Sequence, residues 1–224
     1  MKRIAYLISS YFTYAPLSLP VLLKSMREHG VPREQVFAII CGAAKNVDQI
    51  GPDCTFWHVT HNSRNFSPFV EAVNPERSAA LAGFDYIFLL MCTSEIGPKF
   101  LERTQQIPDG VDVVGAHDFH NYGRAQCDIG TYSLDYLRSR KEVIDQHYRD
   151  TTDEFNIAAE GLMFAEAANR AFYADGKLPM REIPPHRDIY GVGGSRITEY
   201  YESVDLTKYK ANWGQNGRTL LDCI

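Results

Sequence analysis

Short, almost uninterrupted apolar runs alternate with helix-like stretches up to about residue 117. Near-continuous apolar strands separated by helices are typical of a parallel sheet that is covered on both faces. The pattern therefore predicts an α/β fold with a mostly parallel sheet flanked by helices. Five segments are predicted to be strands: Ile4–Ile8, Val36–Cys41, Phe56–Thr60, Tyr86–Met91 and Val111–Ala116. Helices are predicted for Leu17–Met26, from Ser67 to Leu81, and after Pro98.

The second half of the chain has a different pattern of apolar and polar residues. A capping-box pattern, Thr151 to Glu154, precedes a stretch, Phe155–Tyr173, that is predicted to be a long helix. Beyond Pro179 the chain is rich in Pro, Gly, Tyr and Arg, and it offers one weak strand at Arg181–Ile183. We predict one domain over residues 1–224, with an irregular C-terminal lobe.

Composition excludes several classes of protein. The net charge of −5 gives no electrostatic footprint for general nucleic-acid binding. The five cysteines are scattered and never spaced as CxxC, which argues against a zinc cluster and against a disulfide framework. The start, Met1 to Ile8, is too short for a signal peptide, and no apolar run reaches the ~20 residues of a membrane span. We expect a cytoplasmic protein without an integral membrane span.

Polar side chains follow four of the predicted strands. Because ligands of open parallel sheets bind at the carboxyl ends of the strands, these positions are candidates for a binding site. The strand ends carry Ser9, Ser10 and Tyr11; His61, Asn62, Ser63, Arg64 and Asn65; Cys92, Thr93, Ser94 and Glu95; and His117, Asp118, Phe119 and His120.

The glycine pattern does not fit a dinucleotide-binding protein. Such proteins need G-x-G-x-x-G directly after the first strand, so that the backbone can approach a pyrophosphate. Here SSYFTYAP follows that strand, and the glycine cluster at Gly191–Gly194 lies far downstream. A P-loop is absent as well. The same loop lacks the glycines and lysines that a nucleotidyltransferase on a similar sheet would need.

Three segments resemble the first half of a GT-A-type glycosyltransferase: IAYLISSYFTYAPLSLPVLLKSM, VTHNSRNFSPFVEAV and FDYIFLLMCTSEIGPKFLERT. Later segments, among them DIGTYSLDYLRS and YGVGGSRITEYYESVDLTKYKANWG, resemble small transferases of polysaccharide-assembly loci and of large DNA viruses. The resemblance implies that residues 1–117 bind a nucleoside-diphosphate sugar as donor, which we expect to be a UDP-sugar. It also implies that residues 118–224 hold a glycan acceptor. The donor-binding residues implied are Ser9, Ser10, Tyr11, Asn62, Arg64, Cys92, Thr93, Ser94 and Arg196.

One departure from the family concerns the metal. GT-A enzymes usually carry Asp-x-Asp at the end of the fourth strand, whereas this chain has Met91 to Glu95, with Glu95 as its one carboxylate. In one reading, Glu95 or Asp118, with His117 or His120, recruits a weakly bound Mn²⁺ or Mg²⁺. In the other, no metal binds and fixed cations stabilise the leaving diphosphate. The candidate cations are Arg64, Arg196, Lys208 and Lys210.

The acceptor side supplies candidates for catalysis. An inverting transfer needs a general base, and Glu160 is the first choice because its apolar neighbours would raise its proton affinity; Asp118 is the second. Tyr190 and Trp213 are expected to stack on the acceptor sugar. The alternative hypothesis is a non-catalytic nucleotide- or sugar-binding module derived from such a fold, which the missing Asp-x-Asp favours.

Overall fold

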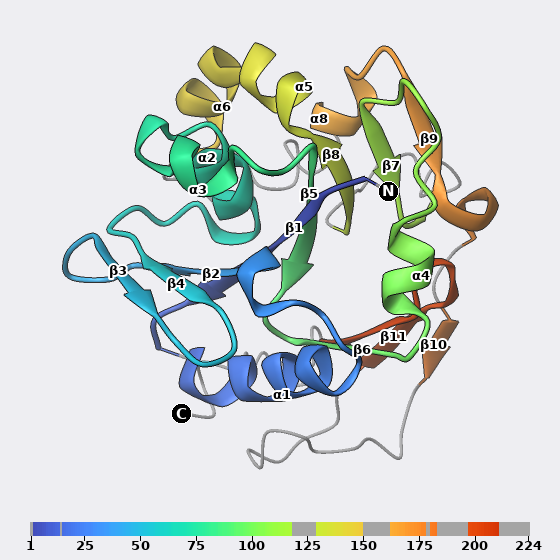
Figure 1. Ribbon diagram of the computed structural model, residues 1–224, viewed down its shortest axis with the longest axis horizontal. Coiled ribbons are helices and arrows are strands. Elements are labelled where there is room, and N and C mark those ends of the chain that lie inside the picture. The colour runs from blue at the N-terminus through green and yellow to red at the C-terminus, as the bar shows by residue number, and fades with distance from the viewer. Residues whose placement is uncertain are drawn as a thin grey trace.

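The computed structural model describes residues 2–13, 15–117, 129–149, 162–177, 180–182 and 197–210. Within these residues a large mixed sheet and a smaller antiparallel sheet are flanked by helices (Figure 1). Among the described helices, none combines the length and the apolar character that a membrane-spanning segment needs.

The large sheet has the strand order β3-β4-β2-β1-β5-β8-β7-β9 in its described part. Four adjacent strands, β4, β2, β1 and β5, run parallel, as the apolar pattern predicts. β8 is antiparallel to both of its neighbours, and β3 is antiparallel to β4. The bounds are β1 Ile4–Tyr11, β2 Val36–Cys41, β3 Val47–Ile50, β4 Thr55–His58, β5 Tyr86–Met91, β7 Val113–Gly115, β8 Gly130–Ser133 and β9 Arg170–Phe172.

The central strands β1, β2 and β5 are buried on both faces, and alternate residues of each strand point to opposite sides. On β1, Ile4, Tyr6 and Ile8 join the core beneath α1, whereas Ala5 and Leu7 join the core on the other side. Figure 1 shows α1 on one side of the sheet and α2, α3, α5 and α6 on the other. The continuous apolar runs in the sequence follow from this two-sided burial.

The helices that cover the sheet are short apart from α1. The predicted helix from Ser67 to Leu81 is divided into three pieces, because Pro75 lacks the backbone N–H that would continue it. The bounds are α1 Ala15–Glu28, α2 Ser67–Ala72, α3 Ser78–Leu81, α4 Phe100–Thr104, α5 Leu134–Ser139, α6 Lys141–His147 and α8 Leu162–Ala165; the 3-10 turns η2 Arg64–Phe66, η3 Pro75–Arg77 and η6 Glu202–Val204 bear on the site.

The smaller sheet corrects the expectation of an irregular C-terminal lobe. Its described strands have the order β10-β11-β12-β6 and pair antiparallel throughout. β6, Ser94–Ile96, begins three residues after β5 ends, so it joins this sheet directly to the centre of the large one. The other bounds are β10 Met180–Glu182, β11 Ile197–Tyr201 and β12 Leu206–Lys210.

Two other predictions change. The long helix expected at Phe155–Tyr173 is wrong in its last part, where α8 ends at Ala165 and the chain then forms β9 at the sheet edge; residues 155–161 lie outside the described part. The stretch between β2 and β4, for which the sequence predicts no element, contains β3, an exposed edge strand. Within the predicted strand Arg181–Ile183, the structure describes Arg181 and Glu182, and both belong to β10.

Candidate functional site

The strand order reverses between β1 and β5. From β1 the chain builds outward on one side through β2 and β4, and then returns to place β5 on the other side of β1. In open α/β sheets, ligands bind outside the carboxyl ends of the strands at such a reversal. The carboxyl ends of β1 and β5, with the start of β6, are therefore the candidate functional site, called here the switch-point site.

The predicted residues Ser9, Ser10 and Cys92 come together at this site. The Ser9 carbonyl accepts a hydrogen bond from the Cys92 amide at 2.9 Å, which fixes the end of β5 beside β1. The Cys92 thiol is buried close to Ser10 and Ser18. Burial raises the pKa of this thiol, so it stays neutral.

Two aromatic rings stand where β1 ends. Tyr11 and Phe12 have ring centroids 4.9 Å apart, and Phe12 is 51% exposed. Gly42, which follows β2, has φ +73°, and a Cβ there would lie 2.5 Å from the Tyr11 ring. Glycine at this position therefore allows both the turn and the close approach of Tyr11. The pair offers an aromatic surface next to the switch point. Of the two residues, Tyr11 was predicted from the sequence and Phe12 was not.

A cluster of buried polar side chains lies on one face of the small sheet. Ser94 on β6 is directly opposite Lys208 on β12, and Lys208 is directly opposite Glu199 on β11. Glu199 accepts a hydrogen bond from the Tyr201 hydroxyl at 3.0 Å, and the Tyr201 ring lies 5.1 Å from the ring of His117 at the end of β7. These five residues form the switch-point cluster.

Burial makes this cluster chemically unusual. Ser94 is 0% exposed and Lys208 is 7% exposed. The Ser94 hydroxyl has no hydrogen-bond partner among the described residues, although polar atoms in protein interiors are nearly always bonded. A lysine that is nearly buried needs a neighbouring charge, and Glu199 is the carboxylate placed opposite it. The arrangement places one cation beside one buried hydroxyl that has no described partner, just after the end of β5.

A divalent cation does not fit the described residues at this site. Consecutive strand residues point to opposite faces, so Glu95 faces away from Ser94 and Lys208. Its carboxylate accepts a hydrogen bond from the Tyr209 hydroxyl at 2.6 Å. No group of three or more His, Cys, Asp or Glu side chains within the described ranges could hold a metal. Asp118 and His120 lie outside those ranges.

A second polar region lies beyond β2, at the end of β4. Asn62 belongs to the loop there, Arg64 is in η2, and Ser63 donates or accepts a 2.7 Å hydrogen bond with Nδ1 of His61. His61 Nε2 lies 3.0 Å from Oε1 of Glu71 on α2. Glu71 is only 1% exposed, and its second oxygen accepts a 2.8 Å hydrogen bond from Nε of Arg77.

Arg77 completes a chain of contacts that links His61, Glu71, Arg77 and Asp48, called here the His61 network. Its Nη1 contacts Asp48 on β3 at 2.6 Å, and its guanidinium carbon lies 4.8 Å from the centre of the Trp57 ring. Two cations and two carboxylates thus link the loop after β4, α2, η3 and the edge strand β3. Their charges balance, which is the condition under which buried ions are tolerated.

The protonation of His61 follows from this setting. Burial opposes the charged ring, but hydrogen bonds with Cys41 and Glu71 outweigh it and raise the pKa of His61 to about 9. For Glu71, burial favours the neutral acid, yet the hydrogen bonds from His61 and Arg77 hold its pKa below the usual value. At neutral pH the pair is therefore an imidazolium and a carboxylate.

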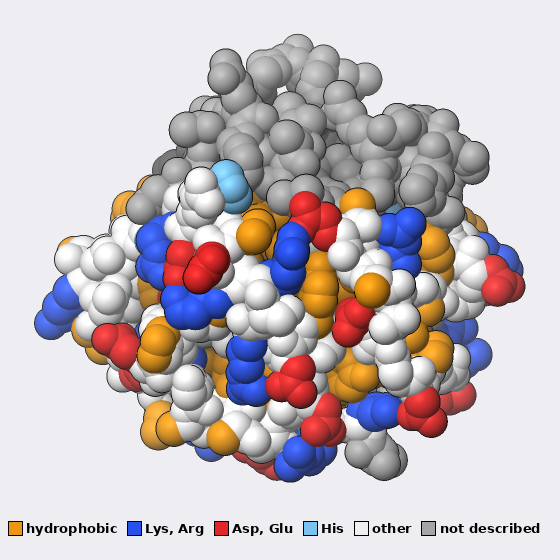
Figure 2. Space-filling model, turned by 90° about the horizontal axis from the view of Figure 1, so that it is seen from above, with side chains coloured by type: hydrophobic (Ala, Val, Ile, Leu, Met, Phe, Trp, Pro, Cys, Tyr) orange, Lys and Arg blue, Asp and Glu red, His pale blue; other side chains and the backbone are white. Residues whose placement is uncertain are grey.

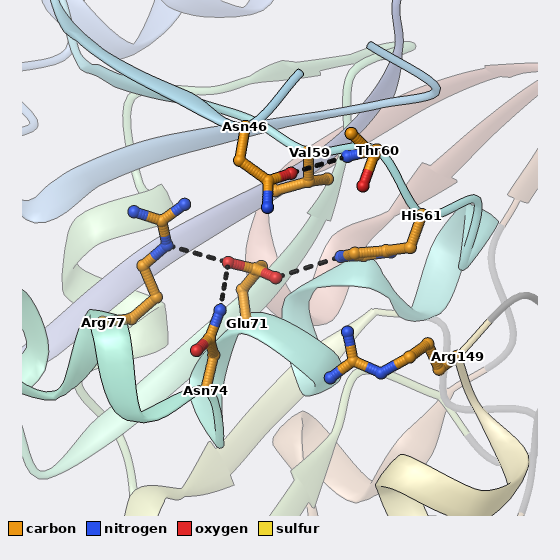
Figure 3. A pocket seen from close by; sticks show the side chains of 8 residues that line it. All are labelled: Asn46, Val59, Thr60, His61, Glu71, Asn74, Arg77 and Arg149. Atoms are coloured by element: carbon orange, nitrogen blue, oxygen red, sulfur yellow. Dashed lines mark hydrogen bonds and ion pairs between the residues drawn. The ribbon is translucent and has the colours of Figure 1, made fainter. Parts of the chain in front are cut away.

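A cavity of about 240 Å³ opens beside this network (Figure 3). Glu71 lies at its centre, with His61 and Arg77 on either side. Asn46 and Arg149 extend toward the space beside Glu71 from opposite sides. The remaining lining residues are Val59, Thr60 and Asn74.

Comparisons with known proteins give a distant likeness only. No protein-family model matches the chain, and no curated protein matches it. Among solved structures, that of S. aureus TarS 1–349 aligns with 77% of this chain at 9% sequence identity and a TM-score of 0.47, and the chain spans 59% of the length of that structure. A likeness this distant carries no argument about activity.

Several predicted site residues lie outside the described part of the chain: Asp118, Glu160, Tyr190, Arg196 and Trp213. Their roles stay predictions, as does the division into a donor half and an acceptor half. Sequence reasoning missed Phe12, Glu71 and Glu199. Glu71 is a single carboxylate among apolar residues in SPFVEAV, which is the pattern that made Glu160 a candidate. In ITEYY, Glu199 and Tyr201 are two residues apart and so share one face of a strand, and Tyr201 is buried.

Proposed function

We propose that this protein transfers a sugar from a nucleoside-diphosphate sugar, most simply a UDP-sugar, to a hydroxyl group of a glycan. The observation that carries the proposal is the reversal of strand order between β1 and β5, where hydroxyls, aromatic rings and a buried lysine gather. The resemblance of the sequence to GT-A enzymes supports the same reaction. In that reaction the acceptor oxygen bonds to the anomeric carbon, the bond from that carbon to the diphosphate breaks, and the nucleoside diphosphate leaves.

The residues at the switch-point site match the parts of such a donor. Tyr11 and Phe12 offer ring faces for the base, and the Ser94 hydroxyl offers a hydrogen bond to the diphosphate. Lys208, the nearly buried cation opposite Ser94, supplies the positive charge that a metal supplies elsewhere and so stabilises the departing diphosphate. Arg64 and Arg196 are further candidates for phosphate contacts, since arginine binds phosphate oxygens in pairs.

The acceptor side of the proposal rests on the sequence. Glu160, or Asp118 in its place, takes the proton of the acceptor hydroxyl as the new bond forms. Tyr190 and Trp213 stack on the acceptor sugar. A retaining mechanism would not require this base, so the stereochemistry of the product is an outcome to measure.

A thermal-shift panel tests donor binding directly. UDP-, GDP-, dTDP- and CMP-sugars are each added with Mn²⁺ and, separately, with EDTA. We expect the UDP-sugar to raise the melting temperature equally in both, since stabilisation grows with the ratio of ligand to dissociation constant and no metal takes part. If no nucleotide sugar shifts the melting temperature, the proposed function is wrong. A shift that requires Mn²⁺ would leave donor binding in place and remove the role of Lys208.

The role of Lys208 is tested with a pair of substitutions. Lys208→Met alone would leave Glu199 as a buried unpaired charge, so the informative variant also carries Glu199→Gln. We expect this double variant to fold and to lose about 10²–10³-fold in donor turnover, the usual effect of removing one preorganised charge partner of a leaving group. Lys24→Met, at an exposed lysine of α1, is the matched control and should keep full turnover. Unchanged turnover in the double variant would contradict the assignment.

A second candidate function is a nucleotide- or sugar-binding module without catalysis. It is favoured by the missing Asp-x-Asp and by the absence, within the described residues, of three or more His, Cys, Asp or Glu side chains placed to hold a metal. The panel separates the two functions when it is followed by an assay for released nucleoside diphosphate. Binding with no release in the presence of glycan acceptors would support the module.

A further inference from the structure

The main side-chain acceptors in the walls of the cavity beside the His61 network each accept at least one hydrogen bond from the protein. Both oxygens of Glu71 are occupied by His61, Arg77 and Asn74. Oδ1 of Asn74 accepts from the Glu76 amide at 3.1 Å, and Oδ1 of Asn46 accepts from the Thr60 amide at 2.9 Å. Each of these acceptors is therefore already engaged by a donor of the protein, and among the lining side chains the Thr60 hydroxyl can both donate and accept.

The donors in the same walls are not used up. Nδ2 of Asn46 has no partner among the described residues, and in Figure 3 it points toward the space beside Glu71. Arg149 carries five N–H donors. One contact is assigned to it, from Nη2 to Asp145 at 3.2 Å. A site whose open groups are donors favours a ligand that is rich in acceptors and negatively charged.

The charges of the lining residues also favour a negatively charged ligand. Glu71 is the single carboxylate among the lining residues, whereas His61, Arg77 and Arg149 are cationic. Asp48 offsets Arg77 and Asp145 partly offsets Arg149, but neither lines the cavity. Figure 2, which looks onto the α5–α6 side, shows acidic and basic side chains mixed over the described surface. The excess of cations is therefore a property of the cavity walls and not of a broad basic surface.

We propose that this cavity is a binding site for a phosphate group, held between Arg149 and Asn46 and backed by the His61 network. A volume of about 240 Å³ equals that of about eight water molecules, which accommodates a phosphate and the first atoms of its ester. The inner residues, His61, Glu71 and Arg77, bond to one another and brace the surrounding elements. Arg149 and Asn46 stand outside that brace and are the groups left to meet a ligand.

Isothermal titration calorimetry with inorganic phosphate tests the site, with chloride added to keep the ionic strength constant. We expect saturable binding to the full-length protein. Arg149→Gln removes a charged donor at an exposed position and should weaken binding about tenfold or more. Asn46→Asp keeps the acceptor for the Thr60 amide but places a carboxylate in the cavity, so it should weaken binding still more.

Arg27→Gln is the matched control. Arg27 is also an exposed arginine paired with an aspartate, but it lies on α1, on the other side of the sheet. This control should bind phosphate as the unchanged protein does. Absence of saturable phosphate binding, or equal binding by Arg149→Gln, Asn46→Asp and Arg27→Gln, would overturn the proposal. Because phosphate is measured directly, the result does not depend on whether the protein transfers sugars.

A second titration identifies where the phosphate group comes from. UDP is titrated into the unchanged protein and into Arg149→Gln, with and without saturating inorganic phosphate. Competition between the two, together with weaker UDP binding by the variant, would assign the cavity to the phosphates of the donor. Independent binding would assign it to a separate phosphorylated ligand, and both results support a phosphate site.

Discussion

The two polar regions at the carboxyl edge of the large sheet differ in how completely their polar side chains are hydrogen-bonded. In the His61 network every buried ion is bonded to another: His61 and Arg77 to Glu71, and Arg77 also to Asp48. In the switch-point cluster a nearly buried lysine stands beside Ser94, whose hydroxyl has no partner among the described residues. A saturated network holds elements in place, whereas an unsaturated one leaves groups for a ligand. This difference agrees with the proposed function, in which the first region braces the fold and the second binds the donor.

The largest effect on stability is expected for a substitution of Glu71, which tests the bracing role of the His61 network. Glu71→Gln keeps the shape of the side chain but leaves the charges of His61 and Arg77 without their carboxylate. We expect the free energy of unfolding to fall by about 3–5 kcal/mol, the usual cost of breaking a buried ion pair by removing one partner. Urea denaturation measures it.

Glu76→Gln provides the control for that substitution. Glu76 is exposed in the turn after α2, so its replacement should change stability by less than about 0.5 kcal/mol. If both variants were equally stable, the network would not act as a brace.

The pH dependence of stability gives a second, smaller effect. The pKa of His61 is about 9 in the folded protein against 6.5 for an ordinary histidine, so folding is favoured by proton binding. This contribution is complete below pH 6.5 and is lost as pH rises through 9; its size is about 3 kcal/mol, from 1.36 kcal/mol per pKa unit. His61→Gln cannot titrate. The stability difference between the two proteins, measured by urea denaturation from pH 6 to 10, should therefore shrink across this window, and a constant difference would contradict the shift.

The smallest expected effect belongs to the switch-point cluster. Ser94→Ala removes a hydroxyl that bonds to no described residue, so stability should hardly change. Donor affinity, measured by calorimetry with the UDP-sugar, should fall about three- to tenfold because a hydrogen bond to the ligand is lost. Ser139→Ala, at an exposed serine of α5, is the control and should keep the donor affinity of the unchanged protein. Equal affinity of Ser94→Ala and Ser139→Ala would contradict the role of Ser94.

The order of the central strands could be anticipated only in part from the sequence. Continuous apolar runs identify β1, β2 and β5 because both faces of those strands are buried, and β2 and β5 have the predicted bounds. The half-buried β4 was also predicted, with bounds shifted by one or two residues. β8 and β9 were not anticipated, since they are short and carry glycine, polar or charged residues. Their place in the sheet depends on partners far away in the chain, such as Phe88 opposite Thr131.

The candidate site, like the strand order, could be anticipated only in part from the sequence. The sequence alone determined that Ser9, Ser10, Tyr11 and Cys92–Glu95 follow buried strands, because a strand of a two-sided sheet must end in a polar loop. It could not determine that Ser94 and Glu95 face opposite sides of a second sheet, or that Lys208, more than a hundred residues away, stands opposite Ser94. Strand register is set by pairing between distant segments, and only the tertiary structure decides which polar groups that pairing buries together.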